Sequence, residues 1–258
     1  MSVLERFSLD GDVAVVTGAG RGLGKEMATA LAEAGADVAI ADIDVESARE
    51  SAEELAGDGT DTTAVEVNVT SEESVEAMVE TVTDELGPVD VLVNNAGVAG
   101  NEPAEEMSLE LWNKVIDVNL TGVFLCSKHV GKQMLDRGEG RIVNIASMSG
   151  FDVNVPQPQV GYNASKAGVR MITQSCAVEW ADRGVRVNAI APGYMRTDLV
   201  DGVLKENPEM EDEWIENTPM GRLGQPHELG PLAVYLASDA SSYMTGSTVL
   251  IDGGYTSR

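Results

Sequence analysis

Cysteine is scarce in this chain: Cys126 and Cys176 are the only two among 258 residues. Two thiols cannot build a disulfide framework or a four-ligand zinc site. Each lies among apolar residues at helical spacing, so we expect both to be inert residues of the core. The two histidines, His129 and His227, have no sequence neighbours at metal-binding spacing, and we expect no metal site.

Long apolar runs are also missing. The longest, such as Val13–Val16 and Val38–Ala41, fall far short of the ~20 residues of a membrane helix. The N-terminal residues lack the basic start and the long apolar centre of a signal peptide. We therefore expect a cytoplasmic protein with no membrane partner.

Basic residues are few: 17 Lys and Arg stand against 43 Asp and Glu, a formal charge of −26, and only 6 of the 17 are lysine. So acidic a surface repels phosphates, and no basic stripe offsets it, which excludes nucleic acid as a ligand. The 43% of hydrophobic residues still suffices for a core. Acid enrichment with few lysines resembles proteins of salt-accumulating halophiles. We hypothesise a high-salt cytosol, with an ordinary acidic enzyme as the alternative.

Short β-branched runs alternate with segments of helical period along the chain. Most of these runs are apolar on both faces, which is typical of parallel strands covered by helices on each side. The order predicts one α/β domain over residues 1–258, a Rossmann-type doubly wound parallel sheet with ligands at the carboxyl ends of its strands. The seven expected strands are Asp12–Thr17, Ala36–Ala41, Thr63–Val67, Val89–Val93, Arg141–Ile145, Val185–Ile190 and Thr248–Ile251.

One segment interrupts this alternation. Residues 194–224 follow Pro192-Gly193, contain two further prolines and delay the last strand. We expect this segment to form a lid over the substrate. Its acidic run Glu209–Glu216 is expected to be a solvated helix face.

A glycine-rich turn, Thr17–Gly24, follows the first expected strand and precedes a helix-like segment. Glycines there allow a tight turn and a close approach to a pyrophosphate, which the N-terminus of the helix stabilises. A Walker A loop would need a hydroxyl at Glu26, and Gly-x-Gly-x-x-Gly would need a glycine at Leu23. The spacing present is Thr-Gly-x-x-x-Gly-x-Gly.

An acidic residue closes the second expected strand. Asp42 can accept hydrogen bonds from the adenosine ribose, and its charge repels the 2′-phosphate of NADP, so NAD is favoured. Asp44 leaves an alternative open, because it could either cap the next helix or take the place of Asp42.

Tyr162 and Lys166 stand four residues apart in Tyr-Asn-Ala-Ser-Lys. On a helix they share one face, where an ammonium group favours the phenolate of a tyrosine whose reference pKa, about 10, is too high for a base at neutral pH. Ser147 follows an expected strand, and Asn119 lies in Asn-Leu-Thr-Gly. Together with the glycine turn, these motifs resemble those of the short-chain dehydrogenase/reductase family.

The resemblance implies a homotetrameric, NAD(P)-dependent oxidoreductase that acts on CH–OH groups. It implies that Tyr162 exchanges the alcohol proton while Ser147 hydrogen-bonds the substrate oxygen. Lys166 would lower the Tyr162 pKa and hold the nicotinamide ribose, and Asn119 would position a water. Ser149 is the alternative to Ser147, and a purely structural role is the alternative for Asn119.

The resemblance also implies a set of cofactor contacts. Arg21 occupies a position where a basic residue of this family often accompanies NADP, which leaves NADP as the less favoured cofactor. Asn68 stands where an Asp is more usual. The implied contacts are Gly18, Arg21, Gly22, Leu23, Gly24, Asp42, Asn68, Val69, Asn95, Tyr162, Lys166, Pro192, Gly193 and Thr197.

Residues Phe151–Gln159 resemble the segment found in polyol, sorbose and gluconate dehydrogenases of the family. Ser149 and the amides of Asn154, Gln157 and Gln159 could hydrogen-bond substrate hydroxyls, unless the prolines merely stiffen the loop. We predict NAD-dependent interconversion of a secondary alcohol and a ketone on a sugar, sugar acid or polyol, a small-molecule substrate. A 3-oxoacyl thioester reductase using NADPH and a non-catalytic dinucleotide-binding sensor are the alternatives.

The acidity generates the first testable prediction. Charges interact over about 8 Å at ~0.15 M salt but over only about 3 Å at ~1 M, so salt should relieve the self-repulsion of this chain. We expect the melting temperature, followed by circular dichroism, to rise between ~0.1 M and ~2 M KCl. A melting temperature that stays flat over this range contradicts the high-salt hypothesis.

Overall fold

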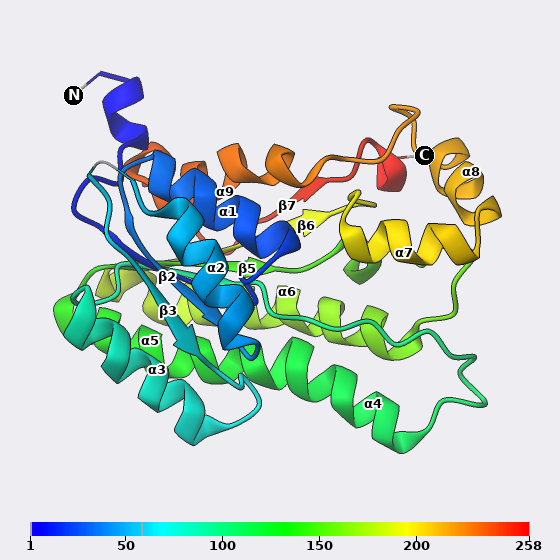
Figure 1. Ribbon diagram of the computed structural model, residues 1–258, viewed down its shortest axis with the longest axis horizontal. Coiled ribbons are helices and arrows are strands. Elements are labelled where there is room, and N and C mark those ends of the chain that lie inside the picture. The colour runs from blue at the N-terminus through cyan, green and yellow to red at the C-terminus, as the bar shows by residue number, and fades with distance from the viewer. Residues whose placement is uncertain (1, 58, 258) are drawn as a thin grey trace.

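The computed structural model describes residues 2–57 and 59–257. Within them, seven parallel strands form one sheet in the order β3-β2-β1-β4-β5-β6-β7, with helices on both faces (Figure 1). The predicted α/β class is confirmed. The strands are β1 (Val13–Thr17), β2 (Asp37–Asp42), β3 (Thr62–Glu66), β4 (Val91–Asn94), β5 (Gly140–Ile145), β6 (Val185–Pro192) and β7 (Thr248–Ile251). The helices are α1 (Gly22–Glu33), α2 (Val45–Leu55), α3 (Glu72–Glu85), α4 (Leu109–Ile116), α5 (Gly122–Arg137), α6 (Val160–Trp180), α7 (Asp198–Glu206), α8 (Glu209–Glu216) and α9 (Gly230–Ala237).

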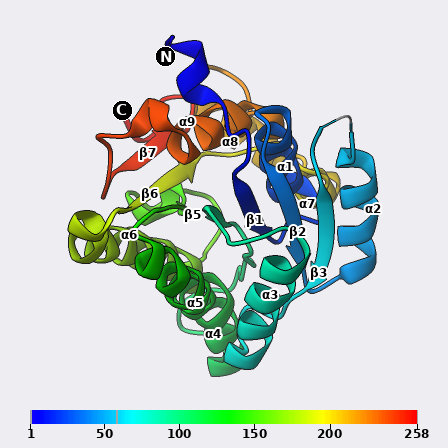
Figure 2. The same ribbon diagram turned by 90° about the vertical axis from the view of Figure 1, so that its left-hand side faces the viewer.

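Successive side chains of the central strands enter two separate cores. In β1, Ala14 and Val16 pack with α1 and α9, whereas Val13 and Val15 pack with α3 and α5 on the other face. Figure 2 shows these two helical layers on either side of the sheet. Because both faces are covered, strands that are apolar throughout are the stable choice, which is why their positions could be read from the sequence.

The strand order reverses between β1 and β4. These two strands are neighbours, and the chain builds outward from them in opposite directions. The connections after β1 and β4 therefore separate and leave a crevice at the carboxyl edge of the sheet, the place where open α/β sheets bind ligands.

A buried polar ladder ties α5 and α6 to the sheet beneath this edge. The amide nitrogen of Asn94 on β4 donates to Ser127 of α5 (3.0 Å) and to the side-chain oxygen of Asn144 on β5 (2.8 Å). Asn144 in turn donates to Thr173 of α6 (2.9 Å). All four side chains are at most 2% exposed, so this network fixes both helices in one register against the sheet.

Cys126 is the core residue that we expected, whereas Cys176 is only partly buried, and the expectation for His129 needs correction. Cys126 is buried in the core, and burial raises its pKa to about 12. Cys176 is partly buried against the same core. His129 does have neighbouring ligands: its Nε2 lies 2.9 Å from Glu72 and its Nδ1 lies 3.4 Å from Glu76.

This contact joins α3 to α5. The position of His129 in the sequence did not indicate that these two helices pack together. The potential ligand atoms of the three side chains lie within 4.8 Å of one another. Glu72 also pairs with Lys128, so the arrangement serves as an ion-pair network between the helices.

No helix within the described parts of the chain is long and apolar enough to cross a bilayer.

Candidate active site

The turn between β1 and α1 has the backbone that approach to a pyrophosphate requires. Gly18 and Gly22 adopt φ values of +65° and +60°. A Cβ on Gly24 would lie 2.4 Å from the Gly18 carbonyl oxygen and 2.5 Å from the side-chain nitrogen of Asn95, so only glycine fits there. Apart from the adjacent residues and the backbone of its own helix, no described atom lies within 4 Å of a Cβ built on Gly22, which leaves room for a phosphate at the N-terminus of α1.

Asn95 locks this turn to the end of β4. Its side-chain nitrogen donates to the carbonyl oxygens of Thr17 (3.0 Å) and Gly18 (2.9 Å). The Thr17 hydroxyl accepts the N–H groups of Asn95 (3.1 Å) and Ala96 (3.2 Å). Asn95 thus holds the glycine turn in place. Thr17 takes part through its hydroxyl, a role that the spacing of the glycines did not indicate.

Asp42 and Asp44 have different roles. Asp44 caps α2: its carboxylate accepts the Ser47 N–H (3.3 Å) and hydroxyl (2.7 Å), and these hydrogen bonds lower its pKa. Asp42, at the end of β2, accepts the N–H groups of Gly20 (2.9 Å) and Asp44 (3.0 Å). Asp42 is therefore the acid held directly beside the glycine turn, and the open alternative for Asp44 is resolved as helix capping.

Two further residues of the cofactor set flank the glycine turn. Arg21 is exposed at the N-cap of α1, and its charge also favours the ionised form of Asp44, lowering the Asp44 pKa. Leu23 lies in the first turn of α1 and packs against the core.

The other expected cofactor contacts lie along the same sheet edge. Asn68 follows β3, and its side-chain oxygen accepts the N–H (3.1 Å) and hydroxyl (2.8 Å) of Thr70, whereas Val69 is buried. Pro192 ends β6. A Cβ on Gly193 would meet the Cα of Asp252 at 2.7 Å. Thr197 caps α7 by accepting the Val200 N–H (3.3 Å).

Tyr162 and Lys166 share one face of α6. The Lys166 ammonium lies 5.7 Å from the centre of the Tyr162 ring and donates to the carbonyl oxygen of Ile145 at the end of β5 (2.7 Å). Lys166 is 4% exposed, and burial lowers its pKa to about 8. Burial raises the Tyr162 pKa, which a hydrogen bond with Ser147 opposes.

Ser147 is the serine that the fold brings to Tyr162. It lies two residues beyond β5 and is 7% exposed. Its oxygen accepts the N–H of Ser149 (3.1 Å), and its hydroxyl donates to the Ser149 oxygen (3.1 Å). Ser149, the alternative considered from the sequence, therefore lies behind Ser147 as its hydrogen-bond partner.

Asn119 occupies a π-helical turn, Asp117–Thr121, within an otherwise continuous helical run from α4 into α5. It is fully buried. Its amide accepts the N–H of Val98 (2.8 Å) and donates to the Val98 carbonyl (2.9 Å) and to Ser165 of α6 (3.2 Å). The side chain therefore ties the connection after β4 to α6, and the water-positioning role expected from the resemblance stays a prediction.

The segment 194–224 is closed at its base. Its two ends form a parallel bridge in which the Arg196 N–H donates to the Gly224 carbonyl (2.7 Å) and the Gly224 N–H to the Tyr194 carbonyl (2.9 Å). Helices α7 and α8 lie between these ends and enclose a small apolar core around Trp214 and Leu223. The acidic run Glu209–Glu216 forms α8, whose Glu211 pairs with Arg196 (2.8 Å).

The amide side chains after Ser149 meet this segment. Asn154 and Gln157 both donate to the Tyr194 hydroxyl (2.9 and 3.0 Å), and Gln159 donates to Asn154 (2.6 Å). The sequence had not singled out Tyr194. The available signal was an aromatic residue directly after Pro192-Gly193, at the first position of the expected lid.

Comparisons with known proteins agree with this geometry. The family model described as enoyl-(acyl carrier protein) reductase matches residues 18–256. Galactitol 2-dehydrogenase of Rhizobium johnstonii is 43% identical over 257 residues, covering 99% of each chain. The crystal structure of a short-chain type dehydrogenase/reductase from Mycobacterium marinum superposes with a TM-score of 0.95 at 43% identity, over 100% of both chains.

A gluconate 5-dehydrogenase from Burkholderia cenocepacia, crystallised with NADP and tartrate, superposes with a TM-score of 0.93 at 36% identity, over 100% of both chains. The chain thus belongs to the short-chain dehydrogenase/reductase family, whose members bind a nicotinamide dinucleotide and are oxidoreductases of CH–OH groups.

The burial of Lys166 generates a prediction on stability. Its pKa is about 8 in the folded chain instead of the usual 10.5, so the unfolded state binds more protons between these values and stability rises with pH in that window. Relative to Lys166→Met, the wild type should gain about 2 to 3 kcal/mol of unfolding free energy from pH 8 to pH 10.5. Urea unfolding of both proteins across this range measures the difference.

The matched control is Lys114→Met, which removes a lysine at an exposed position of α4. Its unfolding free energy should stay within about 0.5 kcal/mol of the wild type throughout. A Lys166→Met difference that does not change with pH would show that Lys166 keeps an ordinary solvated ammonium.

Proposed function

We propose that this protein uses NAD to interconvert a secondary alcohol and a ketone on a sugar, sugar acid or polyol. The observation that carries the proposal is the convergence of Tyr162, Lys166 and Ser147 at the crevice beside the glycine turn. The similarity to galactitol 2-dehydrogenase supports this substrate class.

In this proposal, Tyr162 takes the proton of the alcohol, or returns it in the reverse direction. Ser147 hydrogen-bonds the substrate oxygen as its charge changes. Lys166 stabilises the phenolate of Tyr162 by its charge and holds the nicotinamide ribose. When bound, the dinucleotide supplies the hydride acceptor. Asn119 acts by fixing α6, and through it Tyr162 and Lys166, against the connection after β4.

The preference for NAD rests on Asp42. Its carboxylate lies beside the glycine turn, held by the Gly20 N–H, where it can accept hydrogen bonds from the ribose and where its charge opposes a 2′-phosphate. Arg21 is the residue that favours NADP by its charge. Because Asp44 is committed to capping α2, the ribose contact in the proposal belongs to Asp42, with the other cofactor positions along the sheet edge completing the site.

The segment 194–224 is the substrate lid in this proposal. Its base is pinned, and α7 and α8 have an apolar core of their own, so the segment can move as a unit about its two ends. Ser149, Asn154, Gln157 and Gln159 form the polar side of the pocket beneath it.

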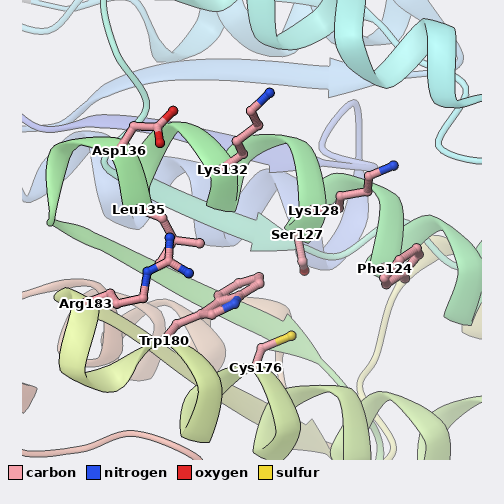
Figure 3. A pocket seen from close by; sticks show the side chains of 9 residues that line it. All are labelled: Phe124, Ser127, Lys128, Lys132, Leu135, Asp136, Cys176, Trp180 and Arg183. Carbon is pink, nitrogen blue, oxygen red and sulfur yellow. The ribbon is translucent and has the colours of Figure 1, made fainter.

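A homotetramer is part of the proposal. Helices α5 and α6 border a hollow of about 180 Å³ (Figure 3). Exposed apolar side chains lie on the same two helices, namely Phe124, Met171 and Val178. Lys128, Lys132, Arg183, Phe124, Ser127, Leu135, Asp136, Cys176 and Trp180 line the hollow. Basic side chains beside apolar ones favour contact with a second copy of this acidic chain. Sedimentation of monomers alone in ~2 M KCl contradicts this part.

Replacement of Tyr162 tests the chemistry. Tyr162→Phe keeps the ring but removes the proton-exchanging hydroxyl, so kcat for alcohol oxidation should fall about 10²- to 10⁴-fold. The assay is a screen of polyols, aldoses and aldonates with NAD in ~2 M KCl, followed at the absorbance of NADH. Tyr243→Phe, at a fully exposed position, is the control and should match the wild type.

The same screen, extended to 3-oxoacyl thioesters and NADPH, separates the alternative functions. Turnover confined to 3-oxoacyl thioesters with NADPH would replace the proposed substrate class. A protein that binds NAD but turns over none of these substrates would be a sensor. Unchanged alcohol oxidation by Tyr162→Phe would refute the assignment of Tyr162.

Replacement of Asp42 tests the cofactor preference. Asp42→Asn preserves the shape and an acceptor for the Gly20 N–H but removes the charge, so the ratio of kcat/KM with NAD to that with NADP should fall at least about 10-fold. Asp44→Asn is the matched control, because asparagine also caps helices well, and its ratio should equal that of the wild type. A drop with Asp44→Asn and none with Asp42→Asn would reverse the assignment.

A further inference from the structure

A continuous chain of hydrogen bonds runs from the lid to the hydroxyl of Ser147. The Trp214 indole N–H of α8 donates to Gln157 (3.2 Å), and Gln157 donates to the Tyr194 hydroxyl (3.0 Å). Asn154 also donates to Tyr194 (2.9 Å) and accepts from Ser149 (2.8 Å). Ser149 in turn accepts from Ser147 (3.1 Å).

The direction of these bonds is set by two groups that cannot change role. The Trp214 indole only donates, so Gln157 turns its oxygen to Trp214 and its nitrogen to Tyr194. The Val155 carbonyl only accepts, and at 3.1 Å it is a nearer acceptor for the single proton of the Tyr194 hydroxyl than the Gln157 oxygen at 3.4 Å. The Tyr194 oxygen then accepts from both amides.

This polarity continues to Ser147. Since Asn154 presents its nitrogen to Tyr194, its oxygen faces Ser149, where it also accepts from Gln159 (2.6 Å). The Ser149 proton is committed to Asn154, so the Ser149 oxygen meets Ser147 only as an acceptor. The Ser149 N–H holds the Ser147 oxygen (3.1 Å), and the Ser147 proton is donated to the Ser149 oxygen until a substrate oxygen becomes the stronger acceptor and takes it over.

The hydrogen-bonding groups of Asn154 are therefore occupied within the protein. Its oxygen has two donors and its nitrogen donates to Tyr194, and the residue is 3% exposed. A substrate hydroxyl could reach this amide only by displacing a buried partner, at the cost of leaving that partner unsatisfied. This argues for a role in holding other groups in place.

The lid contributes the other half of the arrangement. The Tyr194 ring stacks on Trp214 with centroids 4.2 Å apart and an interplanar angle of 12°. Trp214 lies in the apolar core of the lid with Leu204 and Leu223. A displacement of α8 would withdraw the indole N–H from Gln157 and the ring from Tyr194 together, and would remove the groups that fix the direction of the chain.

We propose that Tyr194 and Asn154 are positioning residues that orient the hydroxyl of Ser147 when the lid, residues 194–224, is seated on Phe151–Gln159. Without the Tyr194 hydroxyl, the Asn154 amide can flip and Ser149 is no longer held in one orientation, so the Ser147 side chain loses its fixed hydrogen-bond partner and spends part of its time in rotamers that do not serve the substrate oxygen. The inference rests on the proposed function and deepens it by linking lid closure to the polar groups of the reaction.

The test is a double-mutant cycle with galactitol and NAD as the probes. Tyr194→Phe keeps the stacked ring and removes only the hydroxyl, and Ser149→Ala removes the next link. Because Ser147 acts on charge that develops during the reaction, each single variant should lower kcat about 10-fold while KM changes less than about 2-fold. If both act through one chain, the double variant should lose no more than about the same 10-fold.

Three outcomes overturn the inference. Independent effects would multiply to about 100-fold in the double variant. A raised KM at unchanged kcat would make Tyr194 a substrate ligand. Unchanged kinetics of Tyr194→Phe would leave it no role in the reaction.

Controls distinguish a folding defect, or a failure of the proposed function, from a failure of this inference. Tyr235→Phe, at a partly buried position of α9, should match the wild type, and NAD affinity by calorimetry should be equal in all variants. If Tyr194→Phe does not fold, Trp214→Phe removes the indole donor within the same stack and should lower kcat in the same direction, whereas an unchanged kcat counts against the chain. A wild-type protein that oxidises no alcohol overturns both proposals, whereas an active wild type with an equally active Tyr194→Phe overturns this one alone.

Discussion

The contact between the Lys166 ammonium and the Ile145 carbonyl joins the middle of α6 to the carboxyl end of β5. A buried ammonium is unfavourable unless it is paired or hydrogen-bonded, so this contact fixes where α6 lies along the sheet. Tyr162, one helical turn earlier, is carried by the same helix to Ser147, which follows the same strand. Tyr162 and Lys166 are brought to Ser147 because the Ile145 carbonyl at the end of β5 supplies the acceptor for Lys166.

Asparagines perform the corresponding task on the other side of the crevice. Asn95 fixes the glycine turn, Asn119 ties the connection after β4 to α6, and Asn94 and Asn144 link the strands beneath to α5 and α6. Each amide offers donors and an acceptor in one plane, so a single side chain can hydrogen-bond to polar groups of two different elements. These hydrogen bonds fix the loops at the carboxyl edge of the sheet against the neighbouring strands and helices.

The lid has a weaker connection to the body of the domain. Its helices share an apolar core of their own, and the half-exposed ion pairs of Arg196 with Asp201 and Glu211 lie within the lid and do not join it to the body. Exposed pairs of this kind contribute little to stability. The segment is attached through the bridge at its base, the buried Met195 and the bond from the Met220 N–H to the Gly253 carbonyl (3.1 Å). Tyr194 and Trp214 add polar contacts with residues 151–159, the contacts that the proposed lid movement would break.

The sequence alone determined the sheet, the glycine turn and the catalytic spacing. Strands buried on both faces must be apolar throughout, and Tyr162 and Lys166 share a helix face by local geometry, so neither depends on distant partners. Partner choice was decided by the tertiary structure: Asp44 caps a helix, Asn119 and Asn95 hold backbone, His129 meets α3, and Tyr194 joins the lid to the amides. A side-chain amide, carboxylate or imidazole can hydrogen-bond many groups, and only the packing of distant elements decides which of them it meets.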